Sequence, residues 1–372
     1  MKPIRILQVV TIMNRGGLET MLMNYYRQMD RKKVQFDFMV HRAEEGHYDK
    51  EILELGGRIY RMPQIKPGNY RLYFRLLDDF FKEHMEYKVV HSHINENSCF
   101  VLRAAKKVGI PCRIAHSHLS DLGIDVKLPF RLYARFTMKN NPTNYFACSK
   151  KAGQWLFGNN IATSKKMKVL NNAVNVSEFK FNETTRNNIR KELGIGNELV
   201  IGHIGRFNKQ KNHEFLIEIF KAILQQRQDV ILLLVGDGHL RPSIEKKIVN
   251  LGLSSRVKLL GVRSDISKLM QAMDLFLFPS LFEGLPVVLV EAQAAGLKCV
   301  VSDAITFESD VTGRVEYISL DKSPEYWTKQ ILNSTYEHAD TSEKLKESGY
   351  DSITMAKWLS NYYTDYYSFE AR

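Results

Sequence analysis

The sequence predicts an α/β protein of two domains in series, each built on a doubly wound parallel β-sheet. In the first half of the chain, short apolar runs alternate with amphipathic segments of helical period, and the same alternation starts again in the second half. A chain of 372 residues is also too long for one ordinary hydrophobic core and suits two. We therefore expect two Rossmann-like domains.

In the first half, each apolar run of strand length is followed by a helical pattern. This order suits βαβ units, because parallel strands need long crossover connections. Strands are expected at residues 4–10, 35–40, 88–91, 113–116 and 145–148, and helices at residues 17–29, 70–84 and 99–107.

The second half repeats the order, with strands expected at residues 199–205, 230–235, 257–260, 275–279 and 298–302, and helices at residues 213–226 and 241–250. Between the halves, residues 175–197 are polar and look unstructured. We expect domains of residues 1–178 and 179–356, with a helix over residues 357–372 that packs back on the first domain. Ligands of such sheets bind beyond the carboxyl ends of the strands, so the expected site is a central cleft that both domains face.

Composition excludes several classes of protein. With 44% hydrophobic and 25% charged residues, the chain is not disordered. Its four cysteines form no CxxC pair, which favours free thiols in a reducing cytoplasm over a disulfide framework or a zinc site. No apolar run approaches the roughly 20 residues of a membrane-spanning helix, and we expect no signal peptide.

Charge is unevenly distributed. Residues 1–180 hold 30 Lys and Arg against 16 Asp and Glu, a net charge of +14, whereas the rest of the chain holds 23 against 25. A basic first half suits anionic lipid, acidic substrates or nucleic acid, and charge alone does not choose among them.

The segment FEGLPVVLVE carries the strongest chemical signal. It joins an expected strand to an expected helix, and Pro286 suits a first helical turn because it lacks an N–H. N–H groups at a helix start suit a diphosphate, and we expect those of Gly284 and Leu285 to contribute. Glu283 would face the same ligand, and Glu291 would lie about two helical turns further on. Two isolated acids are, however, more commonly a helix cap and a solvated side chain.

A second segment, HIGRFNKQKN, places two cations after an expected strand. Arg206 and Lys211 could neutralise the charge that develops on a leaving diphosphate. Glycines at turns after other strands would permit close backbone approach to a nucleotide or phosphate; these are Gly236, near Val262 in the next loop, and Gly16 with Gly17.

Two His-x-His clusters also follow expected strands. One contains His91 and His93 and the other contains His116 and His118. Without a third ligand at helpful spacing we expect no metal, and hydrogen-bonded histidines at strand ends remain the plain alternative.

Taken together, these segments resemble the retaining glycosyltransferases of family 4, which have the GT-B fold, and in particular their bacterial exopolysaccharide and capsular polysaccharide members. The match includes Glu283, Gly284, Pro286 and Glu291, followed by an Ala-rich helix, and the cations Arg206 and Lys211, although Asn212 stands where the family has Gly.

The resemblance implies a role for each segment. Glu283 would contact hydroxyls of the donor sugar, Arg206 and Lys211 its diphosphate, and Glu291 the ribose. The turns at Gly236 and Val262 would line the base pocket, and the loop at Gly16 and Gly17 would lie against phosphate. His118, or alternatively His116, would hydrogen-bond the sugar or position the acceptor.

The expected activity is transfer of a hexose-type sugar from a UDP- or GDP-sugar to a lipid-linked or other glycan acceptor in surface polysaccharide synthesis. No cofactor or metal is expected, since no Asp-x-Asp pair occurs in the chain. Two alternatives are a nucleotide-sugar epimerase of the same fold and a basic nucleic-acid-binding protein. The second would require salt-sensitive binding and lacks a recognition motif.

Basic amphipathic segments suggest where the acceptor binds. Residues 127–139 interleave Lys127, Arg131 and Arg135 with large apolar side chains, and residues 66–82 are similar. Such segments favour an anionic membrane surface, although they also suit ordinary helices that pack on a core. We expect a cytoplasmic protein that can lie on the inner face of the plasma membrane.

Overall fold

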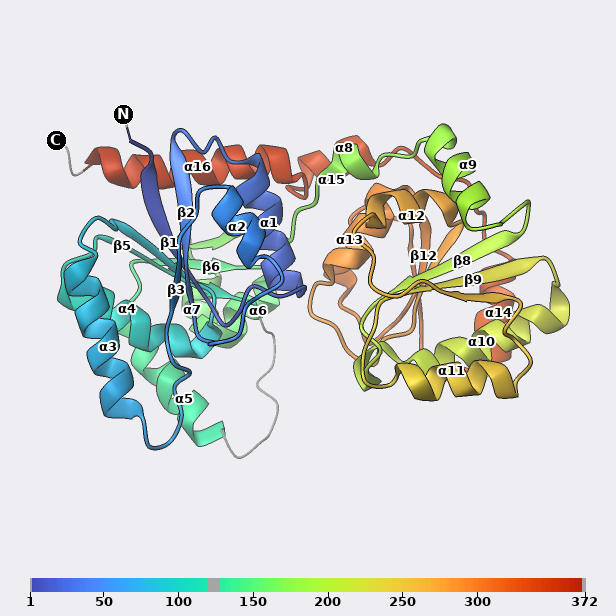
Figure 1. The fold of residues 1–372 in the computed structure, drawn as a ribbon, viewed down its shortest axis with the longest axis horizontal. Helices are drawn as coiled ribbons and strands as arrows, with labels where there is room; N and C mark the ends of the chain where they lie inside the picture. The colour runs from blue at the N-terminus through green and yellow to red at the C-terminus, as the bar shows by residue number, and fades with distance from the viewer. Residues whose placement is uncertain (1, 119–127, 370–372) are drawn as a thin grey trace. The chain divides into compact units, whose positions relative to one another are not determined.

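The computed structural model describes residues 2–118 and 128–369. The chain forms two compact units, Met1–Ala173 with Ser352–Arg372, and Val174–Asp351. Each unit is a parallel sheet covered by helices on both faces (Figure 1). The boundaries predicted from the sequence lie a few residues after these.

The amino-terminal unit holds seven parallel strands in the order β3-β2-β1-β4-β5-β6-β7. They are β1 Ile4–Val10, β2 Val34–Val40, β3 Ile59–Arg61, β4 Val89–Ser92, β5 Cys112–Ser117, β6 Asn144–Ala147 and β7 Met167–Val169. The helices are α1 Gly17–Gln28, α2 Asp49–Glu54, α3 Tyr70–Glu83, η1 Asn95–Asn97, α4 Ser98–Lys107, α5 Leu128–Thr137, η2 Met138–Asn140, α6 Lys150–Phe157, α7 Asn159–Ala162 and α16 Ser352–Phe369.

Two cores flank this sheet. On one face α1 and α16 pack together against β1 and β2, and on the other α3 and α4 cover the sheet (Figure 1). The last helix is therefore part of the first unit, with Leu359 and Tyr363 in its core. β2 (VQFDFMV) is buried along its whole length, and its two polar side chains have partners: Asp37 pairs with Arg5, and the Gln35 amide donates to the Leu55 carbonyl.

The carboxyl-terminal unit holds six parallel strands in the order β10-β9-β8-β11-β12-β13. They are β8 Leu199–Ile204, β9 Val230–Val235, β10 Val257–Leu259, β11 Leu275–Phe278, β12 Lys298–Ser302 and β13 Val315–Ile318. The helices are α8 Val176–Phe179, α9 Glu183–Glu192, η3 Lys209–Lys211, α10 His213–Gln226, α11 Arg241–Asn250, α12 Ile266–Ala272, α13 Val287–Ala294, η4 Phe307–Ser309, α14 Pro324–Leu332 and α15 Ser342–Glu347. Helices α10, α11 and α14 pack on one face of the sheet, and α8, α9, α12 and α13 on the other.

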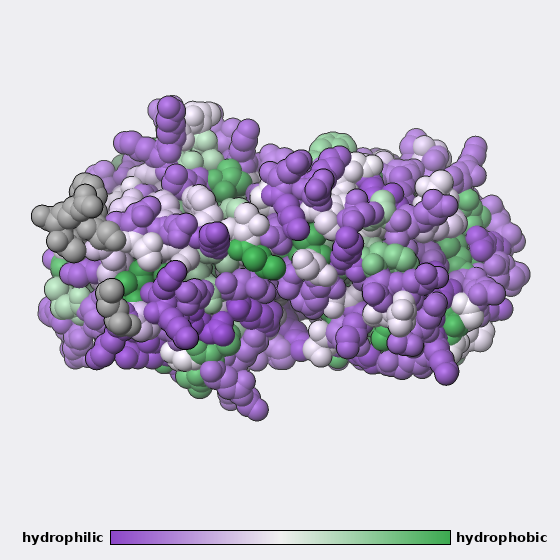
Figure 2. Space-filling model, turned by 90° about the horizontal axis from the view of Figure 1, so that it is seen from above, coloured by the Kyte–Doolittle hydropathy of each residue, from purple (hydrophilic) through white to green (hydrophobic). Residues whose placement is uncertain are grey.

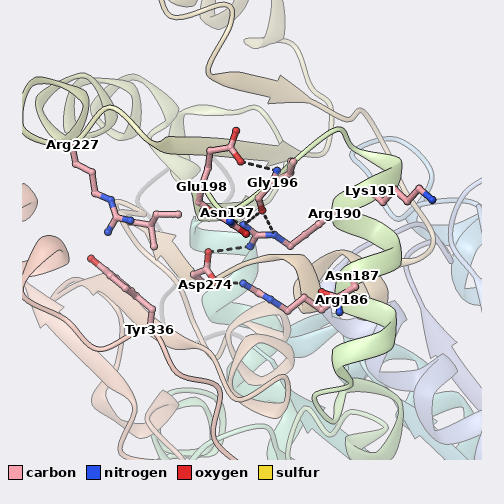
Figure 3. Close-up of a pocket in the computed structure, with 12 residues that line it drawn as sticks. Arg186, Asn187, Arg190, Lys191, Gly196, Asn197, Glu198, Arg227, Asp274 and Tyr336 are labelled. Carbon is pink, nitrogen blue, oxygen red and sulfur yellow. Dashed lines mark hydrogen bonds and ion pairs between the residues drawn. The ribbon is translucent and has the colours of Figure 1, made fainter.

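The prediction that residues 175–197 are unstructured is wrong, because α8 and α9 lie there. The side chain of Asn182 caps α9 by accepting a hydrogen bond from the backbone N–H of Thr185. Arg186 and Arg190, one turn apart on α9, both donate to Asp274 just before β11 (Figure 3). The polar residues that suggested a linker are thus the cap and the anchors of a docked helix.

This arginine and aspartate cluster lines a cavity of about 570 Å³ at the start of β8 and β11 (Figure 3). Arg190 also donates to the backbone carbonyls of Gly196 and Ala272. These guanidinium groups already donate to acceptors within the protein. We therefore attribute the residues that line this cavity to the docking of α9. The cavity lies at the opposite end of the strands from the segments singled out above.

Candidate active site

The candidate site of the carboxyl-terminal unit lies at the carboxyl ends of β8 and β11. The chain forms β9 on one side of β8 and later β11 on the other, so the strand order reverses there. Ligands of open α/β sheets bind at such a switch point. The two loops after these strands are joined: the Leu281 N–H donates to the Gln210 carbonyl at 2.8 Å, and the Gln210 amide donates to the Phe282 carbonyl at 3.0 Å.

An ion pair forms the centre of this site. The Lys211 ammonium lies 2.6 Å from a carboxylate oxygen of Glu283 and 4.5 Å from the centre of the Phe278 ring. Their side chains are only 14% and 9% exposed, so each charge is largely shielded from water and depends on the other. The structure thus brings together two residues that the sequence assigned to one donor, and it adds a direct contact between them.

Arg206 differs from Lys211 in its surroundings. Its side chain is exposed, and within residues 2–118 and 128–369 it makes no ion pair or side-chain hydrogen bond. It follows β8 directly, in the same loop as Lys211. A cation in this state is available for an anionic ligand without first breaking an internal contact.

The backbone conformation of Asn212 explains why this residue can stand where the family has Gly. Its backbone has φ 55° and ψ 44°, in the left-handed region that glycine adopts most easily and that Asn tolerates better than most residues. Its side-chain amide also donates to the Pro279 carbonyl at 3.1 Å, in the neighbouring loop. Asn therefore meets the backbone requirement for which the family has Gly.

The helix after the second loop, α13, begins at Val287, within the range expected from the sequence. Pro286 has φ −73° and ψ 119° and immediately precedes α13, so its expected place in the first helical turn is wrong by one residue. Gly284 is exposed and Leu285 buried in the turn that leads to this helix. Glu283 forms an isolated parallel bridge with Ile305, which fixes the turn from the other side.

Glu291 lies in α13 with its carboxyl group largely removed from water. Burial, and to a lesser extent the negative charge of Glu178 in α8, raise the pKa of Glu291 to about 7. Shifted pKa values of this kind, which leave a carboxyl group half ionised near neutral pH, are common among residues of functional sites.

The remaining predicted positions of this unit lie at the ends of neighbouring strands. Gly236 follows β9 with φ 133°, and a Cβ atom there would lie 2.1 Å from the Gly205 carbonyl oxygen. Its N–H donates to the Gly261 carbonyl at 2.8 Å. Val262, which follows Gly261, is 57% exposed. Only glycine allows these turns to pack so closely at the sheet edge.

In the amino-terminal unit, the loop after β1 leads into α1 at Gly16 and Gly17. Gly16 immediately precedes the helix, and a Cβ atom there would lie 2.3 Å from a carboxylate oxygen of Glu19 in the first turn. The acid is therefore folded back over the start of its own helix. A negative group is favoured there by the helix dipole.

The two His-x-His clusters meet in space at the ends of β4 and β5. A ring nitrogen of His91 lies 3.1 Å from one of His116, and a ring nitrogen of His93 lies 3.0 Å from one of His118. Burial lowers the pKa of all four, that of His118 to about 3. The rings are therefore neutral at physiological pH.

Helix α5 carries the segment predicted to bind an acceptor or membrane. The Arg135 guanidinium lies 5.8 Å from the Trp155 ring centre and donates to the Leu156 carbonyl. Burial raises the pKa of Glu96, and the positive charge of Arg131 partly offsets that rise. Lys127 lies outside the described residues. The residues that α5 exposes are instead apolar: Leu132 (46%), Tyr133 (55%) and Phe136 (71%).

Comparison with known proteins identifies the family. The model of glycosyltransferase family 4 matches residues 15–178, and the model of glycosyl transferases group 1 matches residues 185–351. A putative glycosyltransferase of Bacillus subtilis, EpsF, is 37% identical over 369 residues, with 96% of each chain covered. The chain belongs to glycosyltransferase family 4.

Other relatives agree with this assignment. The glycosyltransferase is 25% identical to the capsular polysaccharide biosynthesis glycosyltransferase CapH of Staphylococcus aureus, over 96% of this chain and all of CapH. It is 29% identical, over 59% of this chain and 58% of the relative, to a UDP-Gal:alpha-D-GlcNAc-diphosphoundecaprenol alpha-1,3-galactosyltransferase of Escherichia coli.

Solved structures show the fold. HepE of Anabaena, in complex with UDP and glucose, superposes with a TM-score of 0.75 at 21% identity and covers 96% of the glycosyltransferase and 99% of its own chain. The lipopolysaccharide glycosyltransferase WaaG superposes with a TM-score of 0.67 at 17% identity, covering 96% and 95%. The predicted GT-B fold of two Rossmann-like domains is confirmed.

Two buried residues that contact the histidines of the glycosyltransferase were not predicted from the sequence. Gln8 accepts a hydrogen bond from a ring nitrogen of His93 at 2.8 Å, and the Tyr363 hydroxyl lies 2.7 Å from one of His91. The sequence held a signal for Gln8, because it is the only uncharged polar residue in the strand IRILQVV. None existed for Tyr363, which is one of several aromatics in the last helix.

Proposed function

We propose that this glycosyltransferase transfers a hexose-type sugar from a UDP- or GDP-sugar to a lipid-linked glycan, with retention of the anomeric configuration and without a metal ion. The observation that supports it most is the shielded pair of Lys211 and Glu283 beside exposed Arg206, at the sheet's switch point. Two cations and one carboxylate suit a ligand that is anionic at one end and rich in hydroxyls at the other.

In this proposal Lys211 and Arg206 bind the diphosphate, and the N–H groups of Gly284 and Leu285 contribute to that site. Glu283 accepts hydrogen bonds from sugar hydroxyls. As the bond from the sugar to phosphate breaks, negative charge grows on the leaving oxygen, and the cations stabilise it. The departing phosphate assists the acceptor hydroxyl from the same face, which accounts for retention.

Further residues extend the donor site. Glu291 accepts from the ribose hydroxyls, and the turns at Gly236 and Val262 contact the base. The loop at Gly16 and Gly17 lies against phosphate when the donor is bound. His118 accepts a hydrogen bond from a hydroxyl of the sugar or acceptor, with His116 behind it.

The acceptor class is supported by the relatives. The Escherichia coli enzyme acts on a diphosphoundecaprenol-linked sugar, and CapH serves capsular polysaccharide synthesis. Among the described residues, no helix combines the length and apolar character that crossing a bilayer requires. We propose that the protein is cytoplasmic and reaches the lipid by lying on the inner face of the plasma membrane.

The surface that touches the membrane is proposed to be α5, through Leu132, Tyr133 and Phe136, with Arg131 and Arg135 near the headgroups. The Lys139 ammonium lies 5.4 Å from the Phe136 ring centre, so cation and apolar group are presented together. For contrast, the face in Figure 2 is largely hydrophilic, with hydrophobic residues in small separate patches.

A donor panel tests the activity. UDP-, GDP-, ADP- and TDP-sugars are compared by thermal shift and by hydrolysis, and proton NMR of the product sugar reports its anomeric configuration. We expect one or more UDP- or GDP-sugars to raise the melting temperature and Glu283→Ala to lose turnover at least 100-fold. No shift with any sugar, or an active Glu283→Ala variant, would refute the proposal. Glu347→Ala, an exposed acid of the same unit, is the control.

A vesicle assay tests the membrane surface. Co-sedimentation with vesicles of phosphatidylglycerol and phosphatidylethanolamine is expected for the wild type, and Phe136→Asp should weaken it at least tenfold. Phe307→Asp is a matched control, because Phe307 is 69% exposed and lies in the other unit. Equal loss in both variants, or no binding by the wild type, would exclude α5 as the membrane surface while leaving the donor site untouched.

A further inference from the structure

The four histidines belong to one continuous chain of hydrogen bonds. His91 pairs with His116, and His93 pairs with His118, through ring nitrogens 3.1 Å and 3.0 Å apart. The two pairs are joined by residues from other elements. Tyr363 of α16 reaches Nδ1 of His91, Gln8 of β1 reaches Nε2 of His93, and the Gln8 amide nitrogen lies 3.3 Å from the Tyr363 hydroxyl. All of these residues belong to the amino-terminal unit.

The protonation state of each group in this hydrogen-bonded chain can be assigned. The imidazoles are neutral, because burial lowers the pKa of each, so each has one N–H and one lone pair. Burial also raises the pKa of Tyr363, which keeps its hydroxyl proton. The direction of every bond in the chain then follows from the orientation of one amide group, that of Gln8.

The first branch runs from Gln8 to His116. The Gln8 amide nitrogen can only donate, so the Tyr363 oxygen accepts from it and donates its own proton to Nδ1 of His91. The proton of His91 therefore lies on Nε2 and is donated to Nδ1 of His116. His116 in turn carries its proton on Nε2, an atom that is buried and has no partner in the described part of the chain.

The second branch runs from Gln8 to His118. The Gln8 carbonyl oxygen can only accept, so Nε2 of His93 carries the proton and donates it. Nδ1 of His93 then accepts from Nε2 of His118. The remaining nitrogen of His118, Nδ1, holds a lone pair, and across residues 2–118 and 128–369 no group bonds to it. The backbone of His118 is held by the Asn95 side chain at 2.9 Å.

We propose that Gln8 and Tyr363 are positioning residues, which hold all four histidines in the Nε2-protonated tautomer and leave Nδ1 of His118 as an acceptor for a hydroxyl group. The inference rests on the proposed function in one respect, namely that this hydroxyl belongs to the sugar or the acceptor. An acceptor at this position discriminates against a ligand that lacks the hydroxyl, because the lone pair would then stay unpaired.

A metal ion is the alternative occupant of this cluster. His91, His93 and His116 each offer a ring nitrogen, and these atoms lie within 4.8 Å of one another. However, a metal takes a lone pair in the plane of each ring, and the rings of His91 and His93 stack with centres 4.2 Å apart and planes at 28°. Lone pairs of stacked rings run side by side and do not converge. The hydrogen-bonded chain therefore accounts better for the observed rings.

Nitrogen NMR of the full-length protein tests the inference directly. Two-bond proton–nitrogen spectra of protein labelled with ¹⁵N-histidine distinguish the two neutral tautomers, and single His→Gln variants assign the signals. We expect the Nε2-protonated pattern for all four residues. Tyr363→Phe removes the donor to His91, so His91 and His116 should become mixtures of tautomers. Gln8→Leu removes the acceptor from His93, so His93 and His118 should do so.

The control is Tyr366→Phe on the same helix. It removes a hydroxyl that contacts Asn144 and not the histidines, so all four tautomers should stay as in the wild type. A different tautomer in any wild-type residue, or an unchanged pair next to either substitution, would overturn the inference. So would a bound metal, detected by elemental analysis of the purified protein and by a change of the four signals on chelation.

Kinetics separate this inference from the proposed function. Gln8→Leu, with its folding checked by circular dichroism, should lower kcat/KM about tenfold, as the loss of one oriented hydrogen bond implies. If the tautomers behave as expected but His118→Ala leaves kcat/KM unchanged, the network stands and the role of His118 at the substrate fails. If the donor panel is positive but the tautomers differ from those expected, the proposed function stands and this inference fails.

Discussion

Glu291 should make the stability of the carboxyl-terminal unit depend on pH in an unusual direction. Burial and Glu178 raise the pKa of Glu291 from 4.5 to about 7 in the folded protein. The folded state therefore holds a proton that the unfolded state has lost, and this stabilisation is complete below pH 4.5 and disappears as the pH rises through 7. Because a tenfold difference in proton affinity corresponds to about 1.4 kcal/mol, about 2.5 kcal/mol of unfolding free energy should be lost between pH 5 and pH 8.

Substituting Glu291→Gln removes this proton equilibrium while it keeps the shape of the side chain. The difference in unfolding free energy between the variant and the wild type should move in favour of the variant by about 2.5 kcal/mol from pH 5 to pH 8. Under the proposed function, nucleotide binding should show the opposite preference, because ribose hydroxyls would donate to the ionised carboxylate. The wild type should bind UDP more tightly as the pH rises through 7, and the variant should bind weakly throughout.

Urea unfolding followed by tryptophan fluorescence measures the effect. The chain has three tryptophans, of which Trp155 and Trp358 lie in the amino-terminal unit and Trp327 in the core of the other. In a background with Trp155 and Trp358 replaced by Phe, Trp327 reports on the carboxyl-terminal unit alone. Glu347→Gln removes one exposed charge and serves as the control. Parallel pH profiles of the wild type and Glu291→Gln would refute the reasoning.

Three further outcomes are expected; changes in stability are measured by urea unfolding in the same background, and UDP affinity by titration calorimetry. Lys211→Met should cost about 2 kcal/mol by leaving the Glu283 charge shielded and unpaired, and adding Glu283→Gln should restore part of that loss; strictly additive effects would show that the pair is not coupled. Asn212→Gly should change stability by less than Asn212→Val, which should cost about 1 kcal/mol or more at φ 55°; equal values would contradict the left-handed backbone. Gly236→Ala should lose both stability and UDP affinity, because its Cβ atom would meet the Gly205 carbonyl oxygen at 2.1 Å; wild-type behaviour would argue against that contact.

Strands that are long and buried could be read from the sequence almost residue by residue. β1 and β9 match the expected ranges: β9 is a continuous apolar run between Asp229 and Gly236, and β1 is a largely apolar run between Pro3 and Thr11. β3, β7 and β13 were not expected. They have three or four residues each and lie near or at the sheet edges, where partial exposure leaves no apolar run to detect.

The candidate site could be predicted as a set of residues but not as a set of contacts. Lys211 and Glu283 were assigned to one ligand through a family pattern, yet their 2.6 Å pairing depends on the packing of two loops 72 residues apart in sequence. The raised pKa of Glu291 likewise comes from burial and from Glu178 on another helix. Such properties arise from tertiary packing, which local sequence patterns do not encode.

The docking of α16 on the first sheet has a consequence for synthesis of the chain. A ribosome makes β1 and β4 early, whereas the helix that covers them and supplies Tyr363 to His91 comes last. The carboxyl-terminal unit, a continuous segment, can fold while the other still waits with the apolar surface of α1 and β2 uncovered. A chain that stops before residue 352 lacks α16, so it leaves the apolar residues that this helix covers exposed to water and the histidine chain without Tyr363.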